Sequence, residues 1–231
     1  MSLLLIVPEK ADPERDRVAD AWVAGGGDVE SLGRFWEPPP YDSRRVRLYG
    51  NDTFCLVLAQ QLGLSLVSPP DDLLLKLPSN LVRRELRVLP FSEADGVHFP
   101  YFVKPLVPKQ FRAAIYDDIA GLQRECKGLD GESLLMASEI VEFESEVRAF
   151  ILHAQVLDAA VYEGEADLSD ALDFLNIVAK ESALPATCVL DVGYIKGRGW
   201  AVIEANATWG AGLNGCDAAK IVPAIAAATC L

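Results

Sequence analysis

The order of apolar and polar positions predicts an alternation of strands and helices in the first third of the chain. Two segments, residues 11–24 and 51–63, have helical spacing and end in glycine. Three apolar runs predict strands around them: residues 3–8, 45–50 and 64–70. This β-α-β-α-β order predicts a small parallel sheet over residues 1–70, with Pro69 and Pro70 at its boundary.

The remainder of the chain is dominated by strands that follow one another through short turns. Residues 71–86 are predicted to be mostly helical with a break near Pro78, and a short strand, "YFVKP", ends near Lys104. Further strands are predicted over 133–141, 146–155, 155–162, 187–195 and 200–206, with helices over 169–183 and 218–230. Frequent hairpins favour an α+β fold for this half.

Composition and charge exclude several classes of function. Hydrophobic residues make up 51% of the 231 positions, which is normal for a packed protein. The net charge of −13 argues against nucleic acid or an anionic membrane as the main partner. We find no apolar run of about 18 residues, and the start of the chain is typical of a strand rather than of a signal peptide. Five scattered cysteines favour reduced thiols in a cytoplasm.

Two carboxylates occupy the middle of apolar strands near the C-terminus, which is unusual. The segment "KGRG" between the strands predicts a hairpin, and we place its centre at Gly197 and Arg198. Counting outward pairs Ile195 with Trp200, Gly193 with Val202 and, last, Asp191 with Glu204. Opposed side chains have Cβ atoms roughly 5 Å apart, and two like charges there are destabilising without a cation between them.

Strand alternation places Asn206 on the same face as Glu204, so that three oxygen ligands converge. Hard oxygen ligands of this kind suit Mg²⁺, which usually also binds phosphates. Two alternatives remain at this point. The acids form a solvated pair on an open sheet face, or a one-residue bulge changes the register.

Three basic residues are candidates for binding phosphate beside such a metal. Lys104 follows apolar residues at a strand end, Lys109 lies in the next loop, and Arg148 lies within a strand. The alternative is an exposed loop lysine for Lys109 and, for Arg148, an ion pair with Glu146 or another acid. The sequence has neither a P-loop nor a G-x-G-x-x-G motif.

Three segments, in order, carry a resemblance to a known family: "SEIVEFESEVRAFILHAQVLDAAVY", "VLDVGYI" and "WAVIEANATWGAG". Together they resemble the ATP-grasp superfamily, and within it the clade named for two arginines and a lysine. The resemblance covers residues 71–231 and implies a nucleotide clamped between two α+β subdomains, 71–137 and 138–231. The sheet of residues 1–70 resembles the pre-ATP-grasp domain.

The resemblance also implies roles for single residues, with ATP and Mg²⁺ as cofactors. Lys104 would contact the α- or β-phosphate, and Arg148 the γ-phosphate or an acyl phosphate. A hinge would read the adenine edge and an acid would hold the ribose: Glu139, Ile140 and Val141 for the hinge, and Glu146 for the ribose. Asp191, Glu204 and Asn206 match the metal set, and Lys109 and Arg84 resemble further basic positions.

The implied activity is that of a cytoplasmic ATP-dependent ligase joining a carboxylate to an amine through an acylphosphate. Its substrates would be small molecules or peptides. The family's glycine-rich loop is replaced here by "PLVPKQF", which keeps a non-catalytic ATP-binding module as an alternative, alongside a kinase. The turn "WGAGLN" of residues 209–214 would border the acceptor, or Trp209 simply packs in the core. Cys216 is interpreted as a buried thiol rather than a nucleophile.

Overall fold

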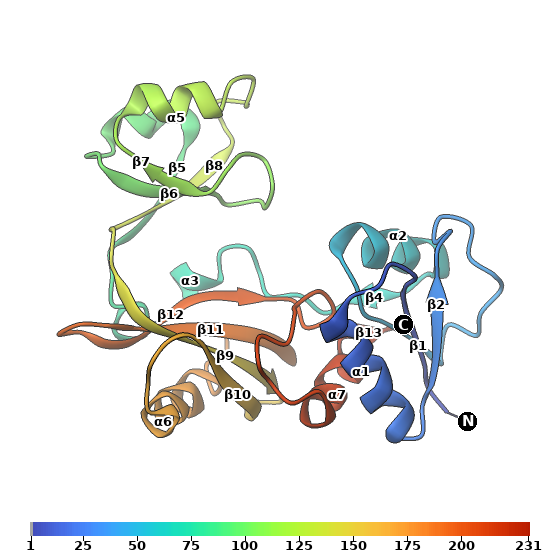
Figure 1. Cartoon of the computed structure of the whole chain (residues 1–231). Coiled ribbons are helices and arrows are strands. Elements are labelled where there is room, and N and C mark those ends of the chain that lie inside the picture. Colours follow the sequence, from blue (N-terminus) through green and yellow to red (C-terminus); the bar gives the residue numbers. More distant parts are fainter. Residues whose placement is uncertain (1) are drawn as a thin grey trace.

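The computed structural model describes residues 2–231, and this part of the chain forms four sheets. A parallel sheet lies at one end, while two four-stranded sheets form an upper lobe and a base (Figure 1). The mixture of separate sheets and helices is the predicted α+β class. Within residues 2–231, no helix has both the length and the apolar character needed to cross a membrane.

The front sheet is parallel and has the strand order β2-β1-β3. Two helices follow its strands, and each begins at a side chain that caps its first turn. Asp12 accepts from two backbone N–H groups of α1, and Asn51 accepts from one of α2. Its elements are β1 (Leu4–Pro8), α1 (Pro13–Ala24), β2 (Asp28–Leu32), β3 (Val46–Leu48) and α2 (Asp52–Leu62).

The membership of this sheet differs from the prediction. The predicted third strand, over 64–70, is reduced to β4 (Ser65–Leu66), which pairs antiparallel with β13 (Thr229–Cys230). The third parallel strand is instead β2, whose sequence "DVESL" lacks an apolar run because it lies at the sheet edge. The predicted final helix is α7 (Ala218–Ala227), and it ends before β13.

The upper lobe is an antiparallel sheet of order β5-β8-β6-β7. The apolar pattern identifies only β6 and β8 in advance. The predicted strand over 133–141 ends at Ser138, which leaves residues 139–142 as a connection between the lobe and the base. The lobe contains β5 (Leu86–Pro90), η1 (Phe91–Gly96), β6 (Tyr101–Pro105), β7 (Ala114–Tyr116), α5 (Ile119–Glu125) and β8 (Leu134–Ser138).

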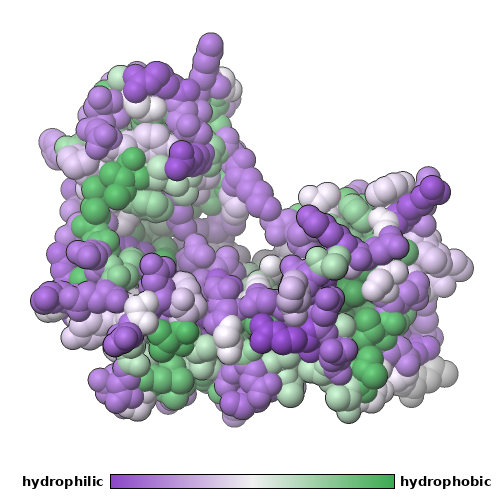
Figure 2. Space-filling view, viewed as in Figure 1, coloured by the Kyte–Doolittle hydropathy of each residue, from purple (hydrophilic) through white to green (hydrophobic). Residues whose placement is uncertain are grey.

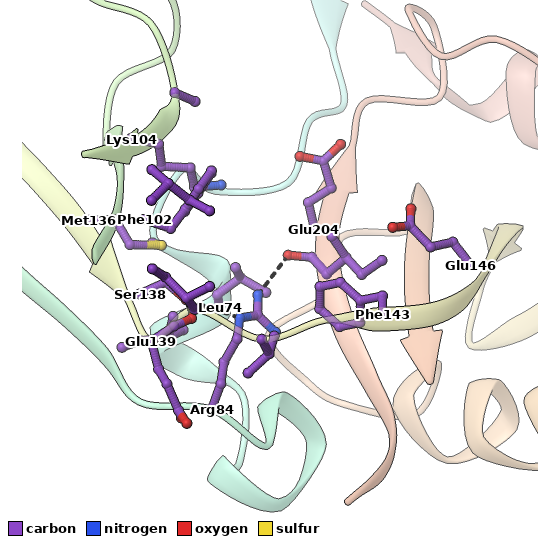
Figure 3. A pocket seen from close by; sticks show the side chains of 16 residues that line it. Leu74, Arg84, Phe102, Lys104, Met136, Ser138, Glu139, Phe143, Glu146 and Glu204 are labelled. Carbon is purple, nitrogen blue, oxygen red and sulfur yellow. Dashed lines mark hydrogen bonds between the residues drawn. The ribbon is translucent and has the colours of Figure 1, made fainter. Parts of the chain in front are cut away.

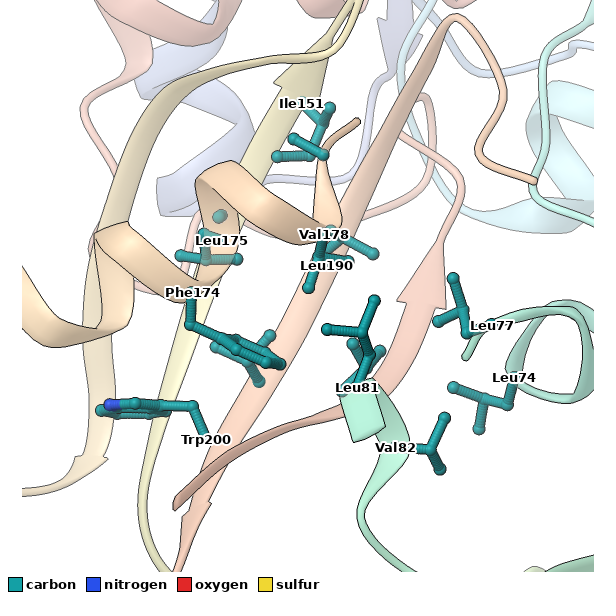
Figure 4. Close-up of a cluster of buried hydrophobic side chains, with 14 of the residues drawn as sticks. Leu74, Leu77, Leu81, Val82, Ile151, Phe174, Leu175, Val178, Leu190 and Trp200 are labelled. Atoms are coloured by element: carbon teal, nitrogen blue, oxygen red, sulfur yellow. The ribbon is translucent and has the colours of Figure 1, made fainter. Parts of the chain in front are cut away.

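The base is an antiparallel sheet of order β10-β9-β11-β12 that packs against α6. Two short helices, α3 (Leu73–Lys76) and α4 (Ser79–Val82), occupy the predicted helical region of residues 71–86, with the break at Pro78. They pack into the core of the base (Figure 4). The base contains β9 (Phe143–Leu152), β10 (Gln155–Gly164), α6 (Leu168–Val178), β11 (Thr187–Ile195) and β12 (Gly199–Asn206).

The β11–β12 hairpin pairs Asp191 with Glu204, as predicted, although by a different route. The turn is one residue shorter than predicted, because Ile195 pairs with Gly199 rather than with Trp200. Gly193 likewise pairs with Ala201 and not with Val202. A β-bulge follows, in which Ile203 has no partner, and this extra residue restores the register at the two acids.

The front sheet and the base share a hydrophobic core. Leu5 and Trp22 of the front part pack in one cluster with Phe150 of β9 and Ile221 of α7. The divisions 1–70, 71–137 and 138–231, and the designation of the front sheet as a pre-ATP-grasp domain, therefore stay proposals. The packing of α3 and α4 on the base favours a later start for the first subdomain.

Candidate nucleotide and metal site

A cavity of about 300 Å³ lies between the upper lobe and the base. A second cavity, of about 390 Å³, adjoins it and shares Leu74, Lys104 and Glu204. The surface is hollowed between the upper lobe and the rest of the molecule (Figure 2). The first cavity is lined by α3, β5 to β9, the connection 139–142 and β12, including Phe102, Lys104, Met136, Ile140, Val141, Phe143, Glu146, Ile203 and Glu204.

Lys104 faces the cavity because β6 alternates. Val103 is buried in the core of the lobe, so its neighbours Phe102 and Lys104 lie on the opposite face. Burial lowers the pKa of Lys104, and the charge of Glu204 opposes this shift only in part. The Lys104 and Glu204 side chains point toward the same space from opposite sides (Figure 3). Within residues 2–231, the Lys104 ammonium has neither a hydrogen bond nor a salt bridge.

The connection between the lobe and the base presents backbone, rather than a carboxylate, to the cavity. Glu139 points away from the cavity (Figure 3), and it accepts hydrogen bonds of 2.6 and 2.9 Å from Arg198. These bonds hold the pKa of the Glu139 carboxyl below its usual value. Ile140 and Val141 line the cavity, and their backbone N–H and C=O groups have no partner among residues 2–231. Open backbone groups of this kind can pair with the polar edge of a planar base.

Asp191 is the most buried acid of the site, at 2% exposure, and Arg148 holds it with two hydrogen bonds. The Arg148 Nε and Nη2 atoms lie 2.8 and 2.7 Å from the two Asp191 carboxylate oxygens. Burial opposes the charge of Arg148, but the bonds to Asp191 outweigh it and raise the Arg148 pKa. The partner of Arg148 is therefore Asp191 and not Glu146.

Asp191, Glu204 and Asn206 converge at one point. The Asn206 Nδ2 atom lies 2.8 Å from Glu204 Oε1 and 3.3 Å from Asp191 Oδ2, between the two carboxylates. A half-turn of this amide replaces Nδ2 by Oδ1 and directs three oxygen atoms at the same space. This donor set fits Mg²⁺. Within residues 2–231 there is no cluster of three His, Cys, Asp or Glu that could hold a metal, so the amide is required as the third ligand.

Glu146 lies two residues before Arg148 on β9. Its side chain lines the first cavity (Figure 3). It accepts a hydrogen bond from the Tyr162 hydroxyl on β10. Burial and this bond raise the Tyr162 pKa. Sequence reasoning does not single out Tyr162, because its alternation on β10 is that of an ordinary strand.

Lys109 and Arg84 lie in different surroundings. Lys109 is exposed in the loop after β6, where it lines the second cavity and forms an ion pair with Asp52 of α2. Arg84 is largely buried and directs its guanidinium at backbone carbonyls of β12. Glu204 lies where three cavities meet. It lines the first with Lys104 and Glu146, the second with Lys104, Lys109 and Asn206, and a further one with Arg148 and Asn206.

Two further residues, Cys216 and Trp209, pack in the interior of the protein. This is the prediction for Cys216 and one of two alternatives for Trp209. Cys216 is 2% exposed, and burial raises the pKa of its thiol to about 12, so it is a buried thiol. Trp209 is 6% exposed and packs in the front core, while the backbone of Gly210 and Gly212 borders a further cavity. This cavity is bordered by residues 209–212 of the turn.

Comparison with known proteins identifies the family and the fold of the chain. A family model matches residues 81–224, and it describes an ATP-grasp domain, family 2 of the clade named for two arginines and a lysine. No curated protein matches the sequence. Among solved structures, a RimK domain ATP-grasp protein from Sphaerobacter thermophilus DSM 20745 is 14% identical, with a TM-score of 0.63 over 97% of this chain and 100% of that chain.

Two other solved structures share the fold. An L-amino acid ligase from Bacillus licheniformis is 11% identical, with a TM-score of 0.61 over 97% of this chain and 75% of that chain. The ATP-grasp ligase PsnB, complexed with minimal precursor, Mg and ADP, is 14% identical, with a TM-score of 0.52 over 97% of each chain. From the family match and the shared fold, the chain belongs to the ATP-grasp domains, in family 2 of the clade named for two arginines and a lysine.

Proposed function

We propose that the protein is an ATP-dependent ligase that joins a carboxylate to an amine through an acylphosphate. The observation that carries this proposal is a partly buried lysine without a partner, Lys104, which faces the converging oxygen ligands of Glu204 and Asn206. A partly buried cation opposite a cation-binding acid set suits a ligand that carries both anionic charge and a metal. A nucleotide with Mg²⁺ is such a ligand.

The nucleotide is proposed to lie along the cavity with its adenine ring at residues 139–141 and its phosphates at Lys104. The unpaired backbone groups of Ile140 and Val141 bind the adenine edge, and Ile203 contributes an apolar surface. Glu146, oriented by Tyr162, accepts from the ribose hydroxyls. Asp191, Glu204 and Asn206 hold Mg²⁺, which when bound neutralises phosphate charge. The fold's ligase members PsnB and the L-amino acid ligase support this class of reaction.

The chemistry requires positioning more than a protein nucleophile. A substrate carboxylate oxygen forms a bond to the γ-phosphorus while the bond from that phosphorus to the β-bridging oxygen breaks, which releases ADP. The amine then attacks the acyl carbon, the phosphate leaves, and the amine loses a proton. Lys104 holds phosphate charge during transfer, Arg148 keeps Asp191 in place, and closure of the lobe over the base would exclude water.

An amine is favoured as acceptor by the charges beyond the metal set. A cavity of about 270 Å³ bordered by Asp52, Arg148 and residues 204–212 leads to one of about 160 Å³ bordered by Asp12, Glu14 and Arg15. Carboxylates outnumber cations along this path, and a negative lining attracts an ammonium group. Small-molecule and peptide amines both remain within the proposal.

A non-catalytic ATP-binding module is the second candidate, and one observation favours it. The loop after β6 contains no glycine, and Lys109 ties it to Asp52 of the front part. A loop held in this way has less freedom to close over the phosphates than a glycine-rich loop. This candidate predicts binding of ATP without release of ADP, whatever carboxylate is supplied.

Trapping with hydroxylamine tests the proposed reaction without knowledge of the acceptor. The protein is incubated with ATP, Mg²⁺, hydroxylamine and pooled amino acids and short peptides, and ADP and hydroxamates are measured by mass spectrometry. We expect both products, their loss in Glu204→Gln, and their retention in Glu165→Gln, a matched change at an exposed acid.

Each other outcome identifies a different function. ATP binding without ADP release indicates the non-catalytic module. ADP with a phosphorylated product that resists hydroxylamine indicates a kinase. Absence of ATP binding contradicts the nucleotide site itself.

A further inference from the structure

Two consecutive residues of β12, Ile203 and Glu204, both line the nucleotide cavity. In a regular strand, neighbouring side chains point to opposite faces of the sheet. The bulge removes this restriction, because the pairing with β11 passes from Val202 to Glu204 and leaves Ile203 without a partner. The proposed adenine surface and the proposed metal ligand thus depend on one local irregularity of the backbone.

β12 is the last strand of its sheet, so no neighbouring strand supports the outer side of the bulge. Arg84 takes this place. Its Nη1 atom donates to the carbonyl of Val202 at 2.7 Å, and its Nη2 atom donates to the carbonyl of Ile203 at 3.0 Å (Figure 3 shows the guanidinium directed at β12). Consecutive carbonyls of a regular strand point to opposite edges, so one guanidinium binds both only where the strand is bulged.

The same guanidinium also reaches the connection between the lobe and the base. Its Nε atom donates to the Ser138 hydroxyl at 3.2 Å, and that hydroxyl donates to the carbonyl of Glu139 at 2.9 Å. A further bond from Nη1 goes to the carbonyl of Val82 at 3.2 Å. Four of the guanidinium's bonds therefore go to protein atoms, which leaves little capacity for a phosphate.

Packing fixes the position of this arginine. Its guanidinium lies 5.7 Å from the centre of the Phe143 ring, and a Cβ atom at Gly193 would lie 2.4 Å from that ring. Burial lowers the pKa of Arg84 to about 10, so the group remains a cation at neutral pH. Gly193 thus leaves room for the ring beneath Arg84 and the bulge.

We propose that Arg84 is a positioning residue that holds the β12 bulge and, through it, directs Glu204 toward Asp191. Its bond to Ser138 anchors the guanidinium at the connection that faces the adenine. The inference rests on the proposed nucleotide site and assigns Arg84 to its assembly rather than to contact with phosphate.

The test compares Arg84→Lys with Arg83→Lys, a matched change at the preceding residue. Lysine keeps the charge but cannot bind two carbonyls as a fork. The Arg83 Nε atom bonds only the nearby carbonyl of Asn80 and none on β12. Calorimetry measures ADP affinity with and without Mg²⁺. The affinity with Mg²⁺ divided by the affinity without it reports on the metal set alone.

We expect Arg84→Lys to lower this ratio by about tenfold, the scale of one hydrogen bond to a charged group. Metal-free ADP affinity and the unfolding temperature should match those of Arg83→Lys. An unchanged ratio overturns the inference, as does an equal loss of affinity with and without metal. Absence of magnesium-dependent binding in the wild type instead contradicts the proposed function.

A measurement on the wild type avoids dependence on the variant's folding. NMR of arginine side chains follows the Arg84 Nη–H signals as ADP and then Mg²⁺ are added. A positioning residue should show slowly exchanging Nη–H protons in all three states, with little change in their shifts. Large shifts on adding the nucleotide phosphates would mark a direct phosphate contact and contradict the inference.

Discussion

Each of the two four-stranded sheets has a cation at the site, but only one of these two cations is paired with an acid in the part of the chain that the structure describes. Arg148, on the base, is 12% exposed and is held by two hydrogen bonds to Asp191. Lys104, on the lobe, is partly buried and has no hydrogen bond or salt bridge within residues 2–231. A cation that is balanced within the protein maintains architecture, whereas one left unbalanced is available to an anionic ligand. On the proposed function, this difference gives the lobe the binding of phosphate and the base the holding of the metal set.

The largest expected effect is on the stability of the base. Asp191→Leu leaves Arg148 as a buried cation without its partner, and we expect a loss of about 3–5 kcal/mol in the free energy of unfolding. Urea denaturation measures it. The double variant Arg148→Met, Asp191→Leu should recover most of the loss because no unpaired charge remains. Equal instability of both variants would show that the pair is not what holds the base together.

Lys104→Met should affect binding instead of stability. We expect ADP affinity to fall by about 10- to 100-fold, since a charge-assisted hydrogen bond to phosphate is lost. The free energy of unfolding should stay the same or rise, because an unpaired buried charge is removed. Calorimetry and urea denaturation measure the two effects, with the exposed Lys127→Met as control. If Lys104→Met were destabilised but bound ADP normally, Lys104 would have a structural role rather than a binding role.

The lowered pKa of Lys104 gives a pH signature of intermediate size. In the free protein burial lowers this pKa, and a bound phosphate raises it again. Below the lowered pKa the lysine is protonated in both states. Above it, nucleotide binding takes up a proton and affinity falls as the pH rises. Calorimetry in buffers of different ionisation enthalpy should detect this uptake in the wild type and not in Lys104→Met.

The smallest effect concerns Glu139 at the connection between the sheets. Its pKa is lowered chiefly by hydrogen bonds from Arg198, so its contribution to stability is complete above the ordinary value of 4.5. That contribution is lost as the pH falls through the lowered pKa. Arg198→Gln should therefore be slightly less stable than the wild type near neutral pH, with the difference disappearing in acid. A difference that persists in acid would contradict the assignment.

The sequence predicts the strands of the base well because their apolar runs are long, and those of β9, β11 and the first half of β12 are also buried. It predicts the front sheet less well, since β2 has a polar edge-strand sequence and β4 pairs with the far end of the chain. Most of the upper lobe is not predicted by periodicity because its strands, such as β7, are short. Pairing across long sequence distances is not encoded in any local pattern.

The predicted pairing of Asp191 with Glu204 is correct because two errors cancel. The hairpin turn is one residue shorter than the prediction assumes, and the extra residue of the bulge at Ile203 compensates for it. The bulge is bound by Arg84, which is 119 positions away from Ile203 in the sequence. The bond between Arg148 and Asp191 likewise follows from the neighbourhood of β9 and β11, which spacing alone does not show.

In the proposed function, Lys104 of the lobe and Glu204 of the base clamp one magnesium nucleotide. Calorimetric titration of wild type and Glu204→Gln with ATP, with and without Mg²⁺, tests it most directly. We predict magnesium-dependent binding in the wild type. Glu204→Gln should lose that dependence and keep, or gain, metal-free affinity, because a carboxylate near the phosphates is removed. No ATP binding by the wild type, or full magnesium dependence in Glu204→Gln, would contradict the claim.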